Sequence, residues 1–297
     1  MVILDEIHKV IGTILGRAMA DGGFSETGQD VTQPDATAWA VLALNAAGVD
    51  KNQLVSALEK LVDFQEPDGR VVFAPRLSSV YWVTPLAILA WLTSSDFEEP
   101  RQRAIDFLLA QSGLHWKNES PNIVGHDTSL RGWPWISGTH SWIEPTSLAM
   151  LALHAAGFRE HPRMAEAVEM VLNRQLASGG WNYGNTTVFG TELQPIPEST
   201  GIALAALEGL VPQTRIAGSL EYAKKQVTRI RTPFTLSWVI LGLGAWSDRP
   251  QRARDWIQES FDRQGQYGEY STSLLSTLIL AYCASGGFLN AIGQHAG

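Results

Sequence analysis

The sequence predicts an all-α protein, a closed α6/α6 toroid in which six inner helices are surrounded by six outer helices. Three observations carry this prediction: an apolar decapeptide that recurs along the chain, charged amphipathic segments between its copies, and a glycine-aromatic turn that follows several of those segments. With 297 residues, of which 45% are hydrophobic and 18% charged, the chain has enough apolar material for a large core.

The recurring decapeptide marks the inner helices. Three copies share an acid, a threonine, two alanines and a leucine at the same five places; they are Asp35–Leu44, Glu144–Leu153 and Glu198–Leu207. A fourth copy, Trp82–Trp91, keeps the threonine and both alanines but has tryptophan in place of the acid. Two weaker copies begin near Thr232, where the sequence does not fix the register, and at Tyr270. Each copy is nearly apolar all round, which is typical of a buried helix.

The segments between these copies have the pattern of half-exposed outer helices, because charges at i, i+3 and i+4 lie beside an apolar stripe. The six segments are approximately 3–19, 51–65, 99–112, 160–176, 214–229 and 249–262. An apolar helix cannot bury itself against one partner, so the helix pairs should stack side by side until the last meets the first. We therefore expect one domain over residues 1–297, a central apolar cavity, and a Trp-rich insertion loop at about 113–143.

A glycine-aromatic turn ends several outer helices. Its clearest copy is Gln175–Trp181, with a Gln-x3-Gly-x-Trp spacing. Less complete copies begin at Gln65 and Ala18, and degenerate copies cover Gln111–Trp116 and Gln264–Tyr267. Glycine permits a left-handed turn, the aromatic ring packs over it, and the glutamine amide can bond the frayed ends of adjacent helices. We therefore expect these residues to have a structural role in holding the helices together.

Charge and cysteine content exclude several classes of function. The net charge is −8 and no basic run occurs, which argues against nucleic-acid binding. The single Cys283 excludes an internal disulfide and a multi-thiolate zinc site, so we expect no metal and no cofactor. Asp5, Glu6 and Lys9 interrupt the N-terminal apolar pattern, which is unlike a signal peptide. We expect a cytoplasmic protein, with peripheral membrane contact left open.

The acids that begin three inner helices have two interpretations. An acid at a helix N-terminus accepts backbone N–H bonds, typically worth about 1 kcal/mol, and capping would explain why Asp35, Glu144 and Glu198 recur in one register. A closed ring would also bring the three carboxylates to one rim, where burial and mutual repulsion would raise one pKa and create a proton donor.

Aromatic residues and the insertion loop supply further candidates. Seven aromatic residues either bind substrate and stabilise cations or fill the core: Trp39, Trp82, Trp133, Trp135, Trp142, Trp238 and Tyr270. A loop of this length is usually a lid or a binding surface. It holds His126 and His140, and His140 is a candidate proton relay to Glu144 or Asp35.

The repeated turns and the inner-helix motif together resemble the QW repeats and inner helices of squalene-hopene cyclases and related class II terpene cyclases. More broadly they resemble the fold shared with protein prenyltransferase β-subunits. In class II cyclases an Asp-x-Asp-Asp-Thr-Ala motif begins an inner helix, and its middle Asp protonates the polyene. Setting Thr37 and Ala38 on the motif's Thr-Ala places Asp35 on that middle Asp, with Gln33 and Ala36 where the flanking acids would be.

The resemblance implies a terpene-cyclase-like isomerase or lyase that binds an isoprenoid in the central cavity and protonates it through Asp35. The prenyltransferase zinc is not implied, because Ala281 stands where an acid would precede Cys283. A non-catalytic toroid that binds a hydrophobic ligand or a protein is the alternative, and a carbohydrate-active toroid using Asp35, Glu144 or Glu198 is the third. A partner domain or a second copy of the chain that completes the site is left open.

Overall fold

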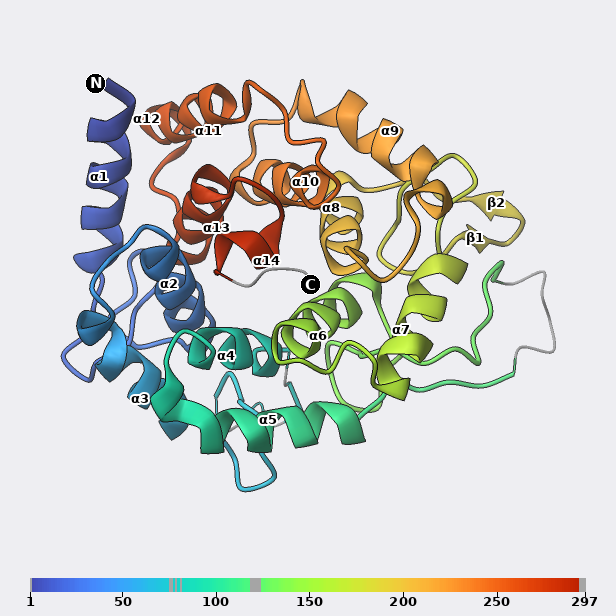
Figure 1. Cartoon of the computed structure of the whole chain (residues 1–297), viewed down its shortest axis with the longest axis horizontal. Coiled ribbons are helices and arrows are strands. Elements are labelled where there is room, and N and C mark those ends of the chain that lie inside the picture. Colours follow the sequence, from blue (N-terminus) through green and yellow to red (C-terminus); the bar gives the residue numbers. More distant parts are fainter. Residues whose placement is uncertain (1, 75–76, 78, 81, 118–123, 294–297) are drawn as a thin grey trace.

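The computed structural model describes residues 2–74, 77, 79–80, 82–117 and 124–293, and over this part of the chain it is an α/α toroid (Figure 1). The six inner helices are α2 (Pro34–Ala46), α4 (Thr84–Trp91), α6 (Ile143–Ala155), α8 (Pro197–Ala206), α10 (Pro233–Ala245) and α13 (Thr272–Cys283). The six outer helices are α1 (Val2–Leu15), α3 (Val55–Asp63), α5 (Glu98–Ala110), α7 (Pro162–Asn173), α9 (Ala217–Val227) and α11 (Ala253–Asp262).

The inner helices form a closed ring. Each packs against the next in chain order, and α13 packs against α2, which joins the last pair to the first as the repeats predicted. Shorter elements connect the pairs: η1 (Lys51–Leu54), η3 (Ser95–Phe97), η4 (Gln213–Arg215) and α12 (Gln264–Tyr267). None of the helices in the described ranges is long and apolar enough to cross a membrane.

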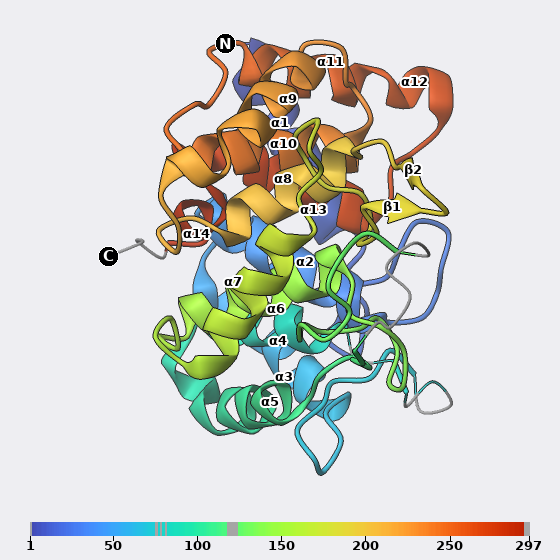
Figure 2. The ribbon, with the colours of Figure 1, turned by 90° about the vertical axis from the view of Figure 1, so that its right-hand side faces the viewer.

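The insertion loop lies beside a small hairpin on one side of the ring (Figure 2). The hairpin consists of β1 (Thr187–Val188) and β2 (Thr191–Glu192). Val124 of the loop pairs with Val188, and Ile136 pairs with Val80. At the base of the loop the Gly113 amide donates to the Gly132 carbonyl at 3.0 Å.

Buried threonine hydroxyls tie four inner helices to the turns that precede them. In each case the threonine Oγ1 accepts the backbone N–H of the residue that follows the turn. The four donor–acceptor pairs are Phe24–Thr37 (3.0 Å), Val71–Thr84 (3.0 Å), Trp133–Thr146 (2.9 Å) and Trp181–Thr200 (3.0 Å). A buried backbone N–H needs a partner, so these bonds give a physical reason for the recurrence of threonine in the inner-helix pattern.

A second hydrogen bond of these hydroxyls shows which residue of α10 is equivalent to the threonine. Thr37 donates to the carbonyl of Gln33, four residues earlier, at 2.7 Å. In α10 the equivalent bond runs from Ser237 to Pro233, also at 2.7 Å. Ser237 therefore has the place of the threonine, and Thr235 stands where three of the other repeats have an acid.

One turn differs from the sequence prediction. The degenerate copy Gln111–Trp116 was expected to place Trp116 over the helix end, but Trp133 has that position. The Trp133 indole donates to the Leu108 carbonyl at 2.9 Å, as Trp181 does to Val171 at 2.7 Å. The insertion loop separates Trp133 from Gln111 along the chain, which hid this pairing in the sequence.

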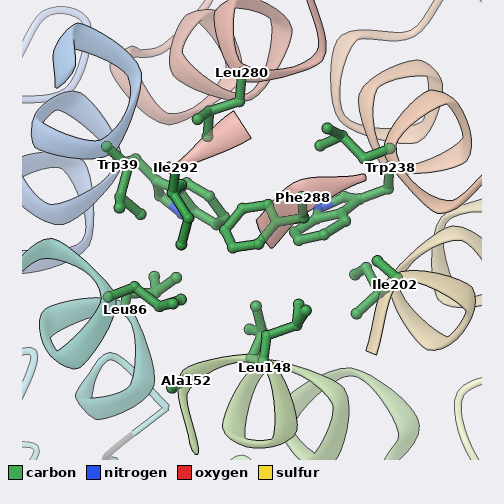
Figure 3. Packing of buried hydrophobic residues seen from close by; sticks show 14 of the residues in the cluster. Trp39, Leu86, Leu148, Ala152, Ile202, Trp238, Leu280, Phe288 and Ile292 are labelled. Carbon is green, nitrogen blue, oxygen red and sulfur yellow. The ribbon is translucent and has the colours of Figure 1, made fainter. Parts of the chain in front are cut away.

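The middle of the ring is filled by side chains (Figure 3). The short helix α14 (Phe288–Ala291) follows α13 and brings Phe288 into the ring. Phe288 stacks on Trp238 with centroids 5.3 Å apart, and Trp39 meets both rings edge-on at 6.3 and 6.1 Å. The exposed fractions of Phe288, Trp238 and Trp39 are 0%, 1% and 5%. At this level the ring contains a packed aromatic layer, a point on which the sequence made no prediction, since it indicated a central apolar cavity without showing whether that cavity is open or filled.

Replacing Phe288 with alanine should cost about 3–5 kcal/mol of unfolding free energy, because it removes the buried ring that α14 contributes to this layer. Urea unfolding followed by circular dichroism measures this cost. Phe189→Ala is the matched control, since that ring is 79% exposed and its loss should change stability by less than about 0.5 kcal/mol. Equal stabilities of the two variants would show that Phe288 does not hold the ring together.

Candidate functional site

The three recurring acids lie inside the first turns of their helices. Asp35, Glu144 and Glu198 are each the second residue of α2, α6 and α8, and the N-cap residues of these helices make no side-chain cap bond. The acids therefore lie two residues inside the N-cap position, but the Asp35 carboxyl still accepts hydrogen bonds from the Ala36 and Asp35 amides, and each negative charge lies at the favourable end of a helix dipole. Because each acid is the second residue of an inner helix, all three lie in the first helical turns at the same end of the ring.

Glu144 and Glu198 form an interacting pair on this rim. Ser199 donates to Glu144 Oε1 at 3.0 Å, and Thr235 donates to Glu198 Oε2 at 3.2 Å. Each acid is thus bonded to a hydroxyl of the next inner helix. Burial raises the pKa of Glu144, the hydrogen bond from Ser199 opposes that rise, and the charge of Glu198 adds to it.

Asp35 has a different environment from the other two acids. Burial raises its pKa to about 6, and the negative charge of Glu26 contributes, while a hydrogen bond from the Ala36 amide opposes the shift. Its Oδ1 atom is buried and has no hydrogen-bond partner among the described residues. Asp35 is the group on the rim that is best prepared to give up a proton near neutral pH.

Glu26, which sequence reasoning missed, is the carboxylate that acts on Asp35. It comes from the turn after α1 and accepts hydrogen bonds from the Thr272 amide at 2.5 Å and the Ser273 hydroxyl at 2.5 Å. These bonds tie it to the start of α13. The sequence offered no signal for this role, because Glu26 lies outside the repeated motif.

The aromatic candidates fall into four groups. Trp82 and Trp135 lie edge-on with centroids 5.7 Å apart, and Trp82 also stacks on Phe73, which makes a half-buried aromatic cluster. Trp39 and Trp238 belong to the packed layer, and the Trp238 indole N–H has no partner in the described part of the chain.

Two aromatic candidates are bound into the scaffold, and a third lies in the insertion-loop region. The buried Tyr270 hydroxyl donates to the Ser260 carbonyl at 2.9 Å. The Trp133 indole packs over the end of α5, where it donates to the Leu108 carbonyl. Trp142 lies near His140, with ring centroids 6.4 Å apart, and His140 is also 4.8 Å from the Trp116 centroid. No hydrogen bond joins His140 to Glu144 or Asp35 within the described ranges. Among those same residues, no group of three or more His, Cys, Asp or Glu could hold a metal ion.

Solved structures share this fold at low sequence identity. A protein from Actinoplanes aligns with a TM-score of 0.62 and 15% identity over 98% of this chain and 100% of its own. An inactive variant of an α-1,6-mannanase from Salegentibacter, in complex with α-1,6-mannotriose, has a TM-score of 0.61 and 10% identity over 95% and 98% of the two chains. A variant of the type II terpene cyclase MstE from Scytonema, in complex with geranylgeranyl dihydroxybenzoate, has a TM-score of 0.60 and 16% identity over 98% of this chain and 97% of its own.

These comparisons define the class of protein as an α/α toroid, and they support the resemblance to terpene cyclases at the level of the fold. The mannanase and the terpene cyclase are about equally similar to this chain. No protein-family profile matches the sequence, and no curated protein matches it. A shared fold does not determine the reaction, which depends on the side chains of the site.

The charge of Asp35 should make stability depend on pH. The folded-state pKa of about 6 lies above the ordinary value of 3.8, so between these values the folded protein holds a proton that the unfolded chain has released. The free energy of unfolding therefore falls as pH rises through this window, by up to roughly 3 kcal/mol. Asparagine does not titrate, so Asp35→Asn should be no more stable than the wild type near pH 4 and clearly more stable at pH 7.

Urea unfolding of both proteins from pH 4 to pH 7 measures this difference, since the other titrating groups are common to the two chains. A stability difference that stays constant across this range would mean that Asp35 has an ordinary pKa.

Proposed function

We propose that the protein is an acid-catalysing enzyme that protonates a double bond of an isoprenoid, with Asp35 as the proton donor. The observation that carries the proposal is the Asp35 carboxyl, with its pKa near 6 and its buried, unpartnered Oδ1. Such a group keeps its proton in about one molecule in ten at pH 7, far more than an ordinary aspartate does. The resemblance of its helix to the proton-donating helix of class II cyclases supports the same role.

The proposed reaction uses Asp35 twice. The carboxyl proton moves to one carbon of the double bond, and the electron pair of that bond forms the new C–H bond. The adjacent carbon is left with a positive charge. After isomerisation or ring closure, a C–H bond beside the cationic carbon breaks, its electron pair forms a new double bond, and its proton leaves. Trp39, one helical turn along α2, offers an aromatic ring to the cation, an interaction worth up to about 2 kcal/mol at a desolvated site. The released proton restores the Asp35 carboxyl directly or through water.

The packed layer limits where the substrate lies. Phe288, Trp238 and Trp39 occupy the middle of the ring, and Trp39 is one turn from Asp35. The proposal therefore places the reacting double bond at the rim beside Asp35, with the apolar layer beneath it. The rest of a long isoprenoid would lie along the rim, where the aromatic cluster of Phe73, Trp82 and Trp135 offers apolar surface.

Glycoside hydrolysis is a second candidate function, favoured by the coupling of Glu144 and Glu198. A carboxyl with a raised pKa beside a charged carboxylate is the arrangement that supplies a general acid and a base or nucleophile. The similarity to a mannanase agrees with this chemistry. Asp35 and Glu26 fit it less well, because both carboxylate oxygens of Glu26 accept hydrogen bonds from the start of α13, whereas Glu144 and Glu198 each accept a hydroxyl on one oxygen.

One substrate panel separates the two candidates. Squalene, prenyl diphosphates and an α-1,6-mannan are incubated with the wild type, Asp35→Asn and Glu144→Gln, and products are identified by mass spectrometry. Asp106→Asn is the control, because Asp106 is exposed on outer helix α5 and bonds only to Gln102 among the described residues. Circular dichroism verifies that all four proteins are folded.

The proposal predicts isoprenoid products from the wild type, a loss of at least about 100-fold in turnover for Asp35→Asn, and unchanged turnover for Asp106→Asn. Mannan hydrolysis that Glu144→Gln abolishes and Asp35→Asn retains would replace it with the glycosidase function. Binding of an isoprenoid without turnover, or equal turnover in Asp35→Asn and the wild type, would show that Asp35 is not a catalytic acid.

A further inference from the structure

A second candidate site lies at the base of the insertion loop, away from Asp35. It is a cavity of about 150 Å³ whose walls include Trp116, His126 and His140 from the loop, Trp142 before α6, and Arg174 after α7. Neither Asp35 nor Glu144 lines it. The residues come from segments that are distant in the sequence, and the fold brings them together.

Arg174 is the principal charge of this cavity. Its side chain belongs to a residue that is only 5% exposed, and burial lowers its pKa to about 10, which still leaves it positively charged at neutral pH. Nη1 donates to the Ser141 carbonyl at 2.5 Å, while Nε is buried and has no partner in the described part of the chain. No carboxylate of the described residues forms an ion pair with it.

A buried, unpaired charge is costly, since its desolvation amounts to several kcal/mol. The Ser141 carbonyl offsets part of this cost by accepting a hydrogen bond from Nη1, but it neither neutralises the guanidinium nor provides a partner for Nε. The remaining donors of Arg174 are suited to a planar anionic group, which a guanidinium binds through two parallel hydrogen bonds.

His126 provides a second unpartnered group in the same walls. It is 9% exposed, and its Nδ1 is buried without a hydrogen-bond partner among the described residues. Burial, the charge of Arg174 and to a lesser extent His140 lower its pKa to about 4, and Asp127 acts in the opposite direction. Asp127 itself is exposed, and its carboxylate accepts bonds from the amide and the hydroxyl of Ser129.

We propose that this cavity binds the carboxylate or phosphate group of a small organic anion. Arg174 pairs with the anion, and the imidazole of His126 donates a further hydrogen bond to it. His140 and the rings of Trp116 and Trp142 pack against the remainder of the molecule. Aromatic walls with a few convergent polar groups are characteristic of small-molecule sites. The inference is independent of the chemistry proposed for Asp35.

Titration calorimetry with inorganic phosphate and with acetate tests the proposal and distinguishes the two anionic groups. The wild type should bind at least one of them saturably. Arg174→Met should weaken that binding by about tenfold or more, because a hydrogen-bonded charge pair is lost. Arg163→Met is the matched control: it removes the same charge from the start of the same outer helix, where Arg163 pairs with Glu166 and stacks on Trp133, outside the cavity.

Histidine NMR spectra of the wild type provide a test that does not depend on a folded Arg174 variant. Titration with the bound anion should shift the ring signals of His126 and His140 along one saturation curve and leave His8 and His154 unchanged. His126→Asn and His140→Asn identify the two signals. Absence of saturable binding by the wild type, equal binding by the two arginine variants, or shifts confined to His8 and His154 would overturn the proposal.

Discussion

The hydrogen bonds of buried threonine hydroxyls are the constraint on which the rest of the ring depends. Each accepts a backbone N–H from the turn that follows an outer helix, so the turn and the next inner helix are held in one relative position. In three of these four repeats an acid stands two residues before the threonine, so the same bond also fixes where Asp35, Glu144 and Glu198 lie. The scaffold and the candidate chemistry are therefore parts of one repeated unit.

The equivalent acids nevertheless have different properties, because their neighbours are not repeated. Glu144 accepts a hydrogen bond from a hydroxyl of the next inner helix and lies near the charge of Glu198. Asp35 lies near Glu26 and has an oxygen without a hydrogen-bond partner among the described residues. Burial disfavours the charged form at both Asp35 and Glu144, and only the latter gains a hydroxyl donor in compensation. Departures from the repeat, rather than the repeat itself, distinguish a candidate proton donor from its counterparts.

Sequence periodicity was sufficient to predict the ring, because both the apolar inner pattern and the amphipathic outer pattern are local and recur. It could not predict the packed centre, since Phe288 lies after the last repeat and α14 is only one turn long. It also misassigned Trp116, because an insertion separates Trp133 from its turn. The role of Glu26 and the cavity beside Arg174 could not be predicted for a related reason. Their neighbours are distant in the sequence and come together only in the closed ring.

The proposed chemistry depends on the protonation of Asp35, whose carboxyl group can be observed directly. NMR of protein labelled with ¹³C at the aspartate side-chain carboxyl carbons, with Asp35→Asn to assign the signal, gives the pKa of this residue in the folded state. We expect a midpoint near pH 6, well above the ordinary aspartate value of 3.8. A midpoint for Asp35 near 4 would contradict this expectation, because the carboxyl would then be an ordinary charged group at the start of a helix.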